Sequence, residues 1–194
     1  MGIPREPLNK NKGLRRDYTR APHITKSYLL GMLHDGTVRK TTYRIAQKGL
    51  AFARMLELGI KRLDGRSWSY QEGKNRDVYI TEFSQSLLHN VTIKTDQDKL
   101  DYVRGYFDAE GGIAKSSHVR FYIYFAQKNY QDLLKVKTIL EEFNIHTGII
   151  HNPSKKIDSE YWRFFVKADS YKRFIITVGS SHPDKSQYFQ LYRG

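Results

Sequence analysis

An internal repeat limits the folds open to this chain more than any other feature of its sequence. Residues 28–36 read YLLGMLHDG and residues 102–111 read YVRGYFDAEG, so each copy has an apolar run, an internal glycine, and an acid followed by glycine. Downstream of each copy, a strand-like segment ends in the tripeptide AQK, at 46–48 and 126–128. Several matches in one order, at an offset of roughly 75–85 residues, predict a tandem duplication.

Each half of the repeat is predicted to run helix, two strands, helix, two strands, helix. After each AQK, apolar residues recur with the helical period, and a Gly-Ile or Asn-Ile pair then predicts a turn. The predicted second strand pairs and closing helices lie at 68–70, 78–83 and 83–88 in the first half, and at 147–151, 161–166 and 171–177 in the second. The fold class is α+β, with two antiparallel four-stranded sheets related by pseudo-two-fold symmetry around a central helix pair.

The repeat also predicts how the chain is divided. We expect a basic N-terminal arm at 1–25, a first repeat at 26–95 and a second repeat at 96–194. Residues 1–26 contain seven cationic side chains against two acids, and both a solvated tail and an arm lying on phosphates stay open. The seven are Arg5, Lys10, Lys12, Arg15, Arg16, Arg20 and Lys26.

The charge balance points to a polyanionic partner. The chain has 33 Lys and Arg against 20 Asp and Glu, a formal net charge of +13. It contains no cysteine, which excludes a disulfide framework and a cysteine zinc site. No apolar run approaches the roughly 18 residues of a membrane span, and the basic N-terminus lacks the apolar stretch of a signal peptide. We therefore expect an intracellular protein, cytoplasmic or organellar and nucleoid-associated, that is neither secreted nor in a membrane.

Alternation along the predicted strands indicates which sheet face meets that partner. In each half, apolar residues that pack on helices alternate with cationic residues, Tyr or Thr that suit base edges and phosphates. Toward the helices we place Tyr43 and Ile45 in the first half, and Phe121, Ile123 and Phe125 in the second. The predicted DNA-binding residues are Arg39, Lys40, Thr42, Arg44, Lys48, Arg66, Lys115, Arg120, Tyr122, Tyr124, Lys128 and Arg163.

The two acid-glycine motifs are predicted to form the central helix pair, at 27–35 and 100–109. Gly31 and Gly105 supply the small residues that two closely packed helices need. The glycine after each acid ends its helix, so each acid lies at a helix C-terminus, where a carboxylate is disfavoured. A bound Mg²⁺ offsets that cost, because it binds carboxylate oxygens together with water and phosphate.

These motifs resemble the LAGLIDADG signature. Residues 105–111, GYFDAEG, look like its second half, with the acid-glycine pair correctly spaced from the internal glycine. Residues 30–36, LGMLHDG, are similar but one residue shorter between glycine and acid. With the surrounding repeats the resemblance covers roughly residues 26–190. It implies a monomeric, two-motif, intron-encoded homing endonuclease that cuts both strands of a long, asymmetric DNA site and leaves short 3′ overhangs.

The resemblance implies roles for the two acids. Asp35 and Glu110 would each hold a divalent metal next to one scissile phosphate, with Mg²⁺ as the metal and Mn²⁺ able to substitute. Taken singly, each acid also fits a surface or turn position, and Asp108 is an alternative ligand. His34 is expected at the helix end or near DNA rather than on the metal, because no second His or Cys stands at ligand spacing.

Further roles follow from the same resemblance. Gln47 and Gln127 match the glutamine that positions the water network in such enzymes. Lys185 matches the basic residue that stabilises charge near the metal, and Lys94 is the weaker candidate for its first-half counterpart. The partner implied is double-stranded DNA, with no protein partner required.

Two questions stay open at this point. Removing one helical residue rotates the end of the first motif by about 100° and shortens it by about 1.5 Å. Asp35 either compensates by lying just beyond the helix, or the first half-site is weak or inactive. An RNA maturase and a DNA-binding protein that does not cleave are the alternative functions, although the retained acids and Gln-Lys pairs favour a nuclease.

Overall fold

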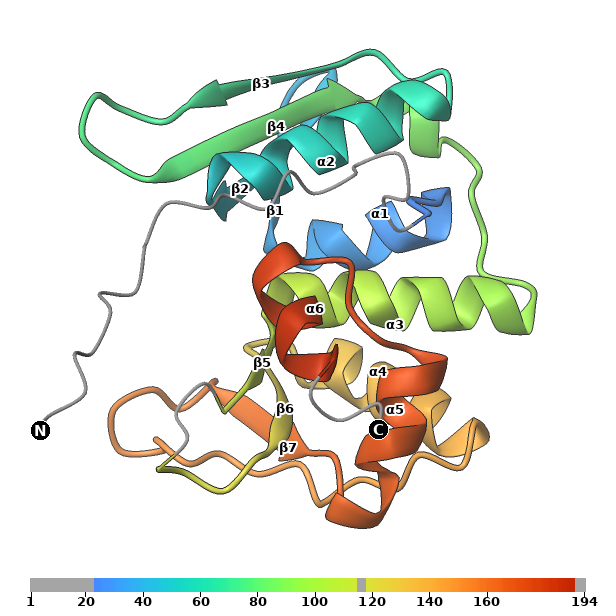
Figure 1. Cartoon of the computed structure of the whole chain (residues 1–194), viewed down its shortest axis with the longest axis vertical. Helices are drawn as coiled ribbons and strands as arrows, with labels where there is room; N and C mark the ends of the chain where they lie inside the picture. The colour runs from blue at the N-terminus through green and yellow to red at the C-terminus, as the bar shows by residue number, and fades with distance from the viewer. Residues whose placement is uncertain (1–22, 115–117, 191–194) are drawn as a thin grey trace, which may run out of the picture.

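The motif helices lie side by side at the centre of the molecule, with one sheet on either side (Figure 1). The computed structural model describes residues 23–114 and 118–190. The first motif forms α1 (Lys26–Met32), continued by a 3₁₀ turn (Leu33–Asp35), and the second forms α3 (Asp96–Glu110). The predicted arm, apart from its last residues, and Lys115 lie outside the described residues.

Backbone contact brings the two motif helices together. A methyl group on Gly31 would lie 2.1 Å from the carbonyl oxygen of Tyr102, and one on Gly105 would lie 2.0 Å from that of Tyr28. No side chain fits at such distances, so both positions require glycine. The contact is reciprocal, since each tyrosine lies three residues before the glycine of its own helix, as the pseudo-two-fold repeat requires.

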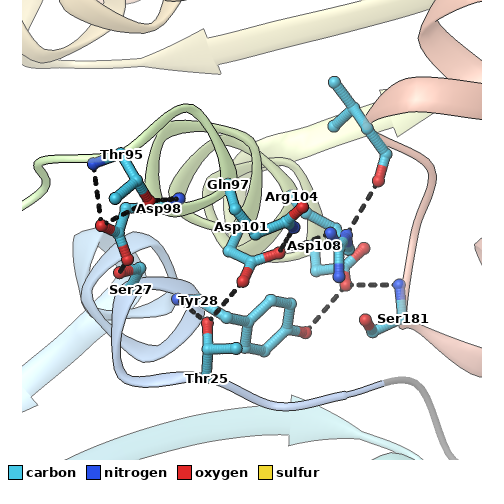
Figure 2. Close-up of polar contacts among 11 residues, drawn as sticks. Thr25, Ser27, Tyr28, Thr95, Gln97, Asp98, Asp101, Arg104, Asp108 and Ser181 are labelled. Atoms are coloured by element: carbon cyan, nitrogen blue, oxygen red, sulfur yellow. Dashed lines mark hydrogen bonds and ion pairs between the residues drawn. The ribbon is translucent and has the colours of Figure 1, made fainter.

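Polar contacts strengthen this seam (Figure 2). Thr95 and Asp98 form a capping box at the start of α3. The hydroxyl of Ser27 donates to Asp98 at 2.8 Å, and that of Thr25 donates to Asp101 at 2.9 Å. The side chains that begin α1 are therefore bonded to the first two turns of α3.

The first half matches the prediction closely. It contains β1 (Gly36–Val38), β2 (Thr42–Lys48), α2 (Leu50–Arg62), β3 (Ser67–Gln71) and β4 (Val78–Ser84). The four strands form one antiparallel sheet in the order β1-β2-β4-β3. On one face α2 packs Phe52, Leu56 and Ile60, spaced four residues apart, into the core formed with Ile45 and Phe83. The closing element is a 3₁₀ turn (Gln85–Leu88), and Phe83 belongs to β4.

The second half contains the corresponding elements with a smaller sheet. They are β5 (Gly111–Ile113), β6 (Ile123–Gln127), α4 (Tyr130–Glu142), β7 (Trp162–Phe165), a 3₁₀ turn (Ala168–Ser170) and α5 (Tyr171–Thr177). The sheet has the order β5-β6-β7. Its core includes Phe125 and Phe164, whose rings stack 5.0 Å apart. The predicted strand at 120–125 begins only at Ile123, although the backbone N–H of Ala114 bonds the carbonyl of Tyr122.

The prediction of a fourth strand in the second sheet is wrong in one respect. Residues 147–151 pair with β7 only at two bridges, Thr147 with Val166 and His151 with Arg163. The two bridges are four residues apart in the segment 147–151 but only three residues apart in the opposite segment, 163–166. One extra residue therefore bulges out and interrupts the ladder.

One helix has no counterpart in the first half. Helix α6 (Pro183–Gln190) follows α5 and packs on the second half of α3 (Figure 1). The ring of Phe189 stacks on that of Phe107 at 5.8 Å, and both side chains are buried. The sequence analysis predicts no helix here. None of the helices among residues 23–114 and 118–190 is long and apolar enough to cross a membrane.

Candidate metal and nucleic-acid site

The ends of the two motif helices place Asp35 and Glu110 at one end of the seam. Glu110 is the last residue of α3, whereas Asp35 ends the 3₁₀ turn that follows α1. A 3₁₀ turn advances about 2.0 Å and 120° per residue, against about 1.5 Å and 100° in an α-helix. Over three residues it recovers about 1.5 Å and about 60°, so it offsets the length lost with the missing residue and part of the roughly 100° rotation.

The Asp35 carboxylate lies close enough to Glu110 to disfavour its ionisation. Burial and the charge of Asp35 raise the pKa of Glu110 to about 7, while Gln127 and Lys185 act in the opposite direction. Asp35 is exposed, yet surrounding protein atoms remove part of its hydration and raise its pKa, against the effect of Lys185. Two neighbouring carboxylates that resist ionisation form a site where a cation would be stabilised.

A glutamine contacts each carboxylate from the end of a strand. The side-chain amide of Gln127, in β6, donates to Glu110 at 2.6 Å and to the carbonyl oxygen of His34 at 3.3 Å. Gln47, in β2, lies 3.4 Å from Asp35. The structure therefore brings together the two acids and both glutamines that the sequence analysis selects.

Lys185 also reaches this site, but its ammonium is bound to backbone. Its Nζ donates to the carbonyl oxygens of Phe107, Asp108 and Gly111 at 2.6–3.0 Å, and it lies 4.8 Å from the Phe107 ring centroid. The side chain, on α6, is only 9% exposed. It caps the C-terminus of α3, where a positive charge is favoured, and lowers the pKa of both site carboxylates.

Asp108 is buried and fully bonded to protein donors. Its carboxylate accepts hydrogen bonds from Tyr28 Oη at 2.8 Å and Ser180 Oγ at 2.5 Å, and from the backbone N–H groups of Ser181 and His182 at 2.8 and 3.1 Å. Figure 2 shows the Tyr28 side chain pointing across the seam toward it. These contacts exclude the alternative role of metal ligand and make Asp108 part of the helix interface.

His34 lies just before Asp35, in the 3₁₀ turn. Its Nδ1 is 3.2 Å from the Asp132 carboxylate and its Nε2 is 2.8 Å from the Tyr102 hydroxyl. Burial lowers the pKa of His34, while Asp132 opposes that shift. Both ring nitrogens are engaged with protein groups, which agrees with the expectation of a helix-end residue.

The prediction that Lys94 belongs to this site is wrong. It precedes the N-terminus of α3, and its backbone N–H bonds the capping residue Asp98. Glu110 is at the other end of a 15-residue helix, which is roughly 20 Å long. Lys94 is close to the second motif in sequence, but it lies at the N-terminus of the motif helix, whereas the acid lies at its C-terminus.

The first sheet carries acids that the sequence analysis missed. Arg44 is paired with Glu72 at 2.5 Å, and Thr42 donates to Glu82 at 2.6 Å. Tyr70 also donates to Glu82, at 3.2 Å. Strand alternation could have found Glu82, since Arg44 lies opposite it in the β2–β4 register. Two of the predicted DNA-binding residues are therefore held by carboxylates on the same surface.

The second sheet presents aromatic side chains around one arginine. The Arg163 guanidinium lies 4.9 Å from the Tyr124 ring centroid and donates to the hydroxyl of Tyr161 at 2.8 Å. Tyr122 and Phe165 meet edge to face at 5.8 Å. Tyr124, Tyr161 and Lys128 also line a hollow of about 470 Å³ beside Glu110 and Gln127. The aromatic surface is therefore continuous with the carboxylate site.

The remaining predicted DNA-binding residues lie apart from the carboxylates or at exposed positions. Arg39, Lys40, Lys48, Arg66, Arg120 and Lys128 are exposed. Arg66 shares a hollow with Lys26, in the first turn of α1, so it lies toward the opposite end of that helix from Asp35. Lys128 pairs with Asp158 at 3.2 Å. Contact of these side chains with DNA stays a prediction.

Comparisons with known proteins agree with this architecture. Residues 97–179 match a family model described as LAGLIDADG-like domain. The fold is similar to that of I-DmoI in its crystal structure with DNA and Mn, at a TM-score of 0.59 and 20% identity over 81% of this chain and 97% of I-DmoI. It is also similar to the N-terminal LAGLIDADG domain of DUF199/WhiA, at 0.64 and 18% over 82% and 87%.

A longer relative has the same fold. Full-length DUF199/WhiA from Thermatoga maritima aligns at a TM-score of 0.66 and 16% identity, over 90% of this chain and 63% of that protein. No curated protein matches the sequence significantly. The match of residues 97–179 to the family model and the fold of both repeats agree with the resemblance seen in the two motifs: the chain contains a LAGLIDADG-like domain and has the fold of the solved LAGLIDADG structures it matches.

Proposed function

We propose that this protein is a site-specific DNA endonuclease that makes a metal-dependent double-strand break. The observation that carries the proposal is the pairing of Asp35 with Glu110 at the ends of two packed helices, each contacted by a glutamine. Two such acids, one from each repeat, suit two phosphodiester bonds on opposite strands. The surplus of cationic residues in the sequence provides the attraction to a polyanion.

The donor set at this site fits Mg²⁺, with Mn²⁺ as a substitute. Asp35 and Glu110 offer hard carboxylate oxygens, and burial raises the pKa of both, so a bound cation would favour their ionised forms. No cluster of three or more His, Cys, Asp or Glu exists in the described part of the chain, so water and DNA phosphate would complete the coordination. When bound, the metal would polarise the phosphoryl oxygen and supply an activated water.

The protein's own residues have distinct roles in this proposal. Gln47 and Gln127 orient the carboxylates and the water between them and DNA. Lys185 keeps positive charge behind the end of α3 and favours ionised Glu110 and Asp35. The buried Asp108 holds the helix ends in place and takes no part at the reacting phosphate.

The two unlike sheets favour a long, asymmetric target. The first sheet offers Arg44 and Thr42 with their acidic partners, whereas the second offers Tyr122, Tyr124 and Arg163. Hydrogen-bonding groups read base edges, so two different surfaces select two different half-sites. Both glycine contacts are already used within one chain, so we expect a monomer on DNA, acting at the insertion site of its own intron.

The test is cleavage of a plasmid carrying the joined exon sequence that flanks this reading frame. With Mg²⁺, the wild-type protein should linearise this plasmid, and the double variant Asp35→Asn/Glu110→Gln should not. Glu160→Gln is a control, because it makes the same Glu-to-Gln change as at Glu110 but at an exposed position. Specific binding without cleavage in Mg²⁺ or Mn²⁺ would overturn the proposal.

A second function uses the same surface without cutting DNA. The shortened first motif and the backbone-bound ammonium of Lys185 favour it, since both depart from what the resemblance implies. The protein would then hold intron RNA as a maturase, or DNA as a binding protein. Filter binding of the intron transcript, compared with the target duplex, separates these cases from the nuclease.

A further inference from the structure

His34 joins three helical elements from both repeats. The residue belongs to the 3₁₀ turn after α1, and its ring contacts Tyr102 on α3 and Asp132 in the first turn of α4. The His34 ring also packs 4.6 Å from that of Tyr106. Only 18% of the His34 side chain is exposed. The His34 side chain therefore connects the end of the first motif to two helices of the second repeat.

The chemistry of the contacts fixes which nitrogen carries the proton. A neutral imidazole has one N–H donor and one acceptor nitrogen. The Asp132 carboxylate accepts only, so Nδ1–H donates to it, and Nε2 accepts from the Tyr102 hydroxyl. Lys135 lies 4.7 Å from the centroid of the Tyr102 ring and covers this contact from α4. Every polar atom of the ring is thus used in holding its orientation.

The same position in the other motif has a corresponding structural role. Asp108 lies three residues after Gly105, as His34 lies three residues after Gly31. The hydroxyl of Tyr28 bonds Asp108, and the hydroxyl of Tyr102 bonds His34. Asp108 is further held by Ser180 and by two backbone N–H groups. For His34 the further polar contact of its side chain is with Asp132.

We propose that Asp132, acting through His34, is a positioning residue that fixes the 3₁₀ turn and thereby the carboxylate of Asp35. The inference rests on the proposed function only in so far as Asp35 acts on DNA. Within residues 23–114 and 118–190, the Asp35 side chain accepts one hydrogen bond, a weak one at 3.4 Å from Gln47, and no side chain caps the turn. The backbone carbonyl of His34 also accepts a hydrogen bond from Gln127, whose side chain bonds Glu110. The His34–Asp132 contact is therefore connected to both acids.

The first measurement uses free protein and does not depend on any activity. Hydrogen exchange of two backbone amides reports the order of the turn: that of Leu33, which starts the turn and bonds carbonyls of Leu29 and Gly31 in α1, and that of Gly36, which bonds the carbonyl of Leu33. Asp132→Ala should accelerate exchange here about tenfold, which corresponds to the loss of about one hydrogen bond. Asp132→Asn should stay close to wild type, because its side-chain oxygen still accepts from Nδ1–H.

The chain offers a matched control. His146 and Asp169 form another His–Asp contact at 3.2 Å, in which both side chains are about 60% exposed and which lies after α4 and before α5, outside the motif helices. Asp169→Ala should leave the exchange of Leu33 and Gly36 unchanged. Unchanged exchange in Asp132→Ala, equal acceleration throughout α4 and the core, or an Asn variant that behaves like Ala would each overturn the proposal.

The second measurement concerns strand selectivity and separates this inference from the proposed function. Asp35→Asn first identifies the strand whose cleavage depends on Asp35. Asp132→Ala should slow that strand about tenfold relative to the other and accumulate nicked plasmid, with DNA binding unchanged. Equal slowing of both strands would overturn the positioning role. If the wild-type protein does not cut DNA, the proposed function fails. The exchange experiment still tests whether Asp132 orders the 3₁₀ turn through His34.

Discussion

The hydroxyl of Tyr28, on the first motif helix, donates a 2.8 Å hydrogen bond to the buried carboxylate of Asp108 on the second. Glu110 lies only two residues further along, yet it is accessible to a hollow and bonded to a single glutamine. The two acids of α3 therefore have different roles: Asp108 stabilises the contact between the motif helices, and Glu110 faces the hollow. Four hydrogen-bond donors around Asp108 account for its structural role.

Tyr28→Phe should lower the free energy of unfolding by about 1–3 kcal/mol, because it removes a hydrogen bond to a buried acid. Urea denaturation measures the change. Tyr43→Phe is a control for the loss of a tyrosine hydroxyl at a partly buried position of the same half. An unchanged midpoint in Tyr28→Phe would mean that the other three donors satisfy Asp108 alone.

Glu110→Gln should abolish double-strand cutting while DNA affinity stays within about a factor of ten, since metal ligation is lost but the cationic surface is kept. Asp35→Asn should do the same. Affinity is measured by mobility shift in Ca²⁺, and cutting by plasmid linearisation in Mg²⁺, with Glu160→Gln beside them. Near-normal cutting by Asp35→Asn would show that another residue serves the first half-site.

Metal binding should depend on pH through the titration of Glu110, whose pKa of about 7 lies above the ordinary 4.5. The metal requires the ionised form, so apparent Mn²⁺ affinity should weaken about tenfold per pH unit below 7 and level off above it. In the metal-free protein, the free energy of unfolding changes with pH in the opposite direction to metal affinity. The contribution of this group is present below about pH 4.5 and is lost as the pH rises through 7. Calorimetric Mn²⁺ titration and thermal unfolding between pH 5 and 8, with Glu110→Gln as reference, measure both effects.

Lys185→Met should destabilise the fold by about 2–4 kcal/mol, because three carbonyl oxygens at the end of α3 lose their donor inside the protein. Chemical denaturation measures this change without DNA. Lys172→Met, at a neighbouring helix of the same half, is the control for loss of one lysine charge. A variant with wild-type stability and no cleavage would assign Lys185 to the reaction alone.

Arg44→Ala should relax specificity at particular base pairs, whereas Glu72→Ala should raise affinity for all sequences by releasing that arginine. Binding to a set of singly substituted target duplexes, at several salt concentrations, distinguishes the two. For the wild type, log affinity should fall with log salt with a slope on the order of −6 to −10. Equal loss on every duplex for Arg44→Ala would make it a phosphate contact.

The sequence repeat predicted the helix pair and the order of most elements, without α6 and the break in the second sheet, and the family resemblance selected the two acids and two glutamines that the structure brings together. It succeeds there because glycine spacing, strand alternation and matched motifs are local properties that survive in each copy. The alternation of Ile45 with Arg44 is one example, since burial of alternate residues follows directly from the pleat.

Other features depend on contacts that no local pattern reports. The extra residue between Thr147 and His151 breaks a ladder whose partner strand is ten residues or more away. Helix α6 has few apolar residues and is held by Phe189 and Lys185 against α3. The pairing of Arg44 with Glu72 and of His34 with Asp132 is likewise set by tertiary structure.

The seam between the motif helices has a consequence for building chimaeras. Its glycine contact is made by backbone, so any half with the same motif would supply it. The bonds of Thr25 to Asp101 and of Ser27 to Asp98 depend instead on particular side chains of both halves. A hybrid protein that takes its first half from this chain and its second from a relative would need acids at both α3 positions to retain these bonds.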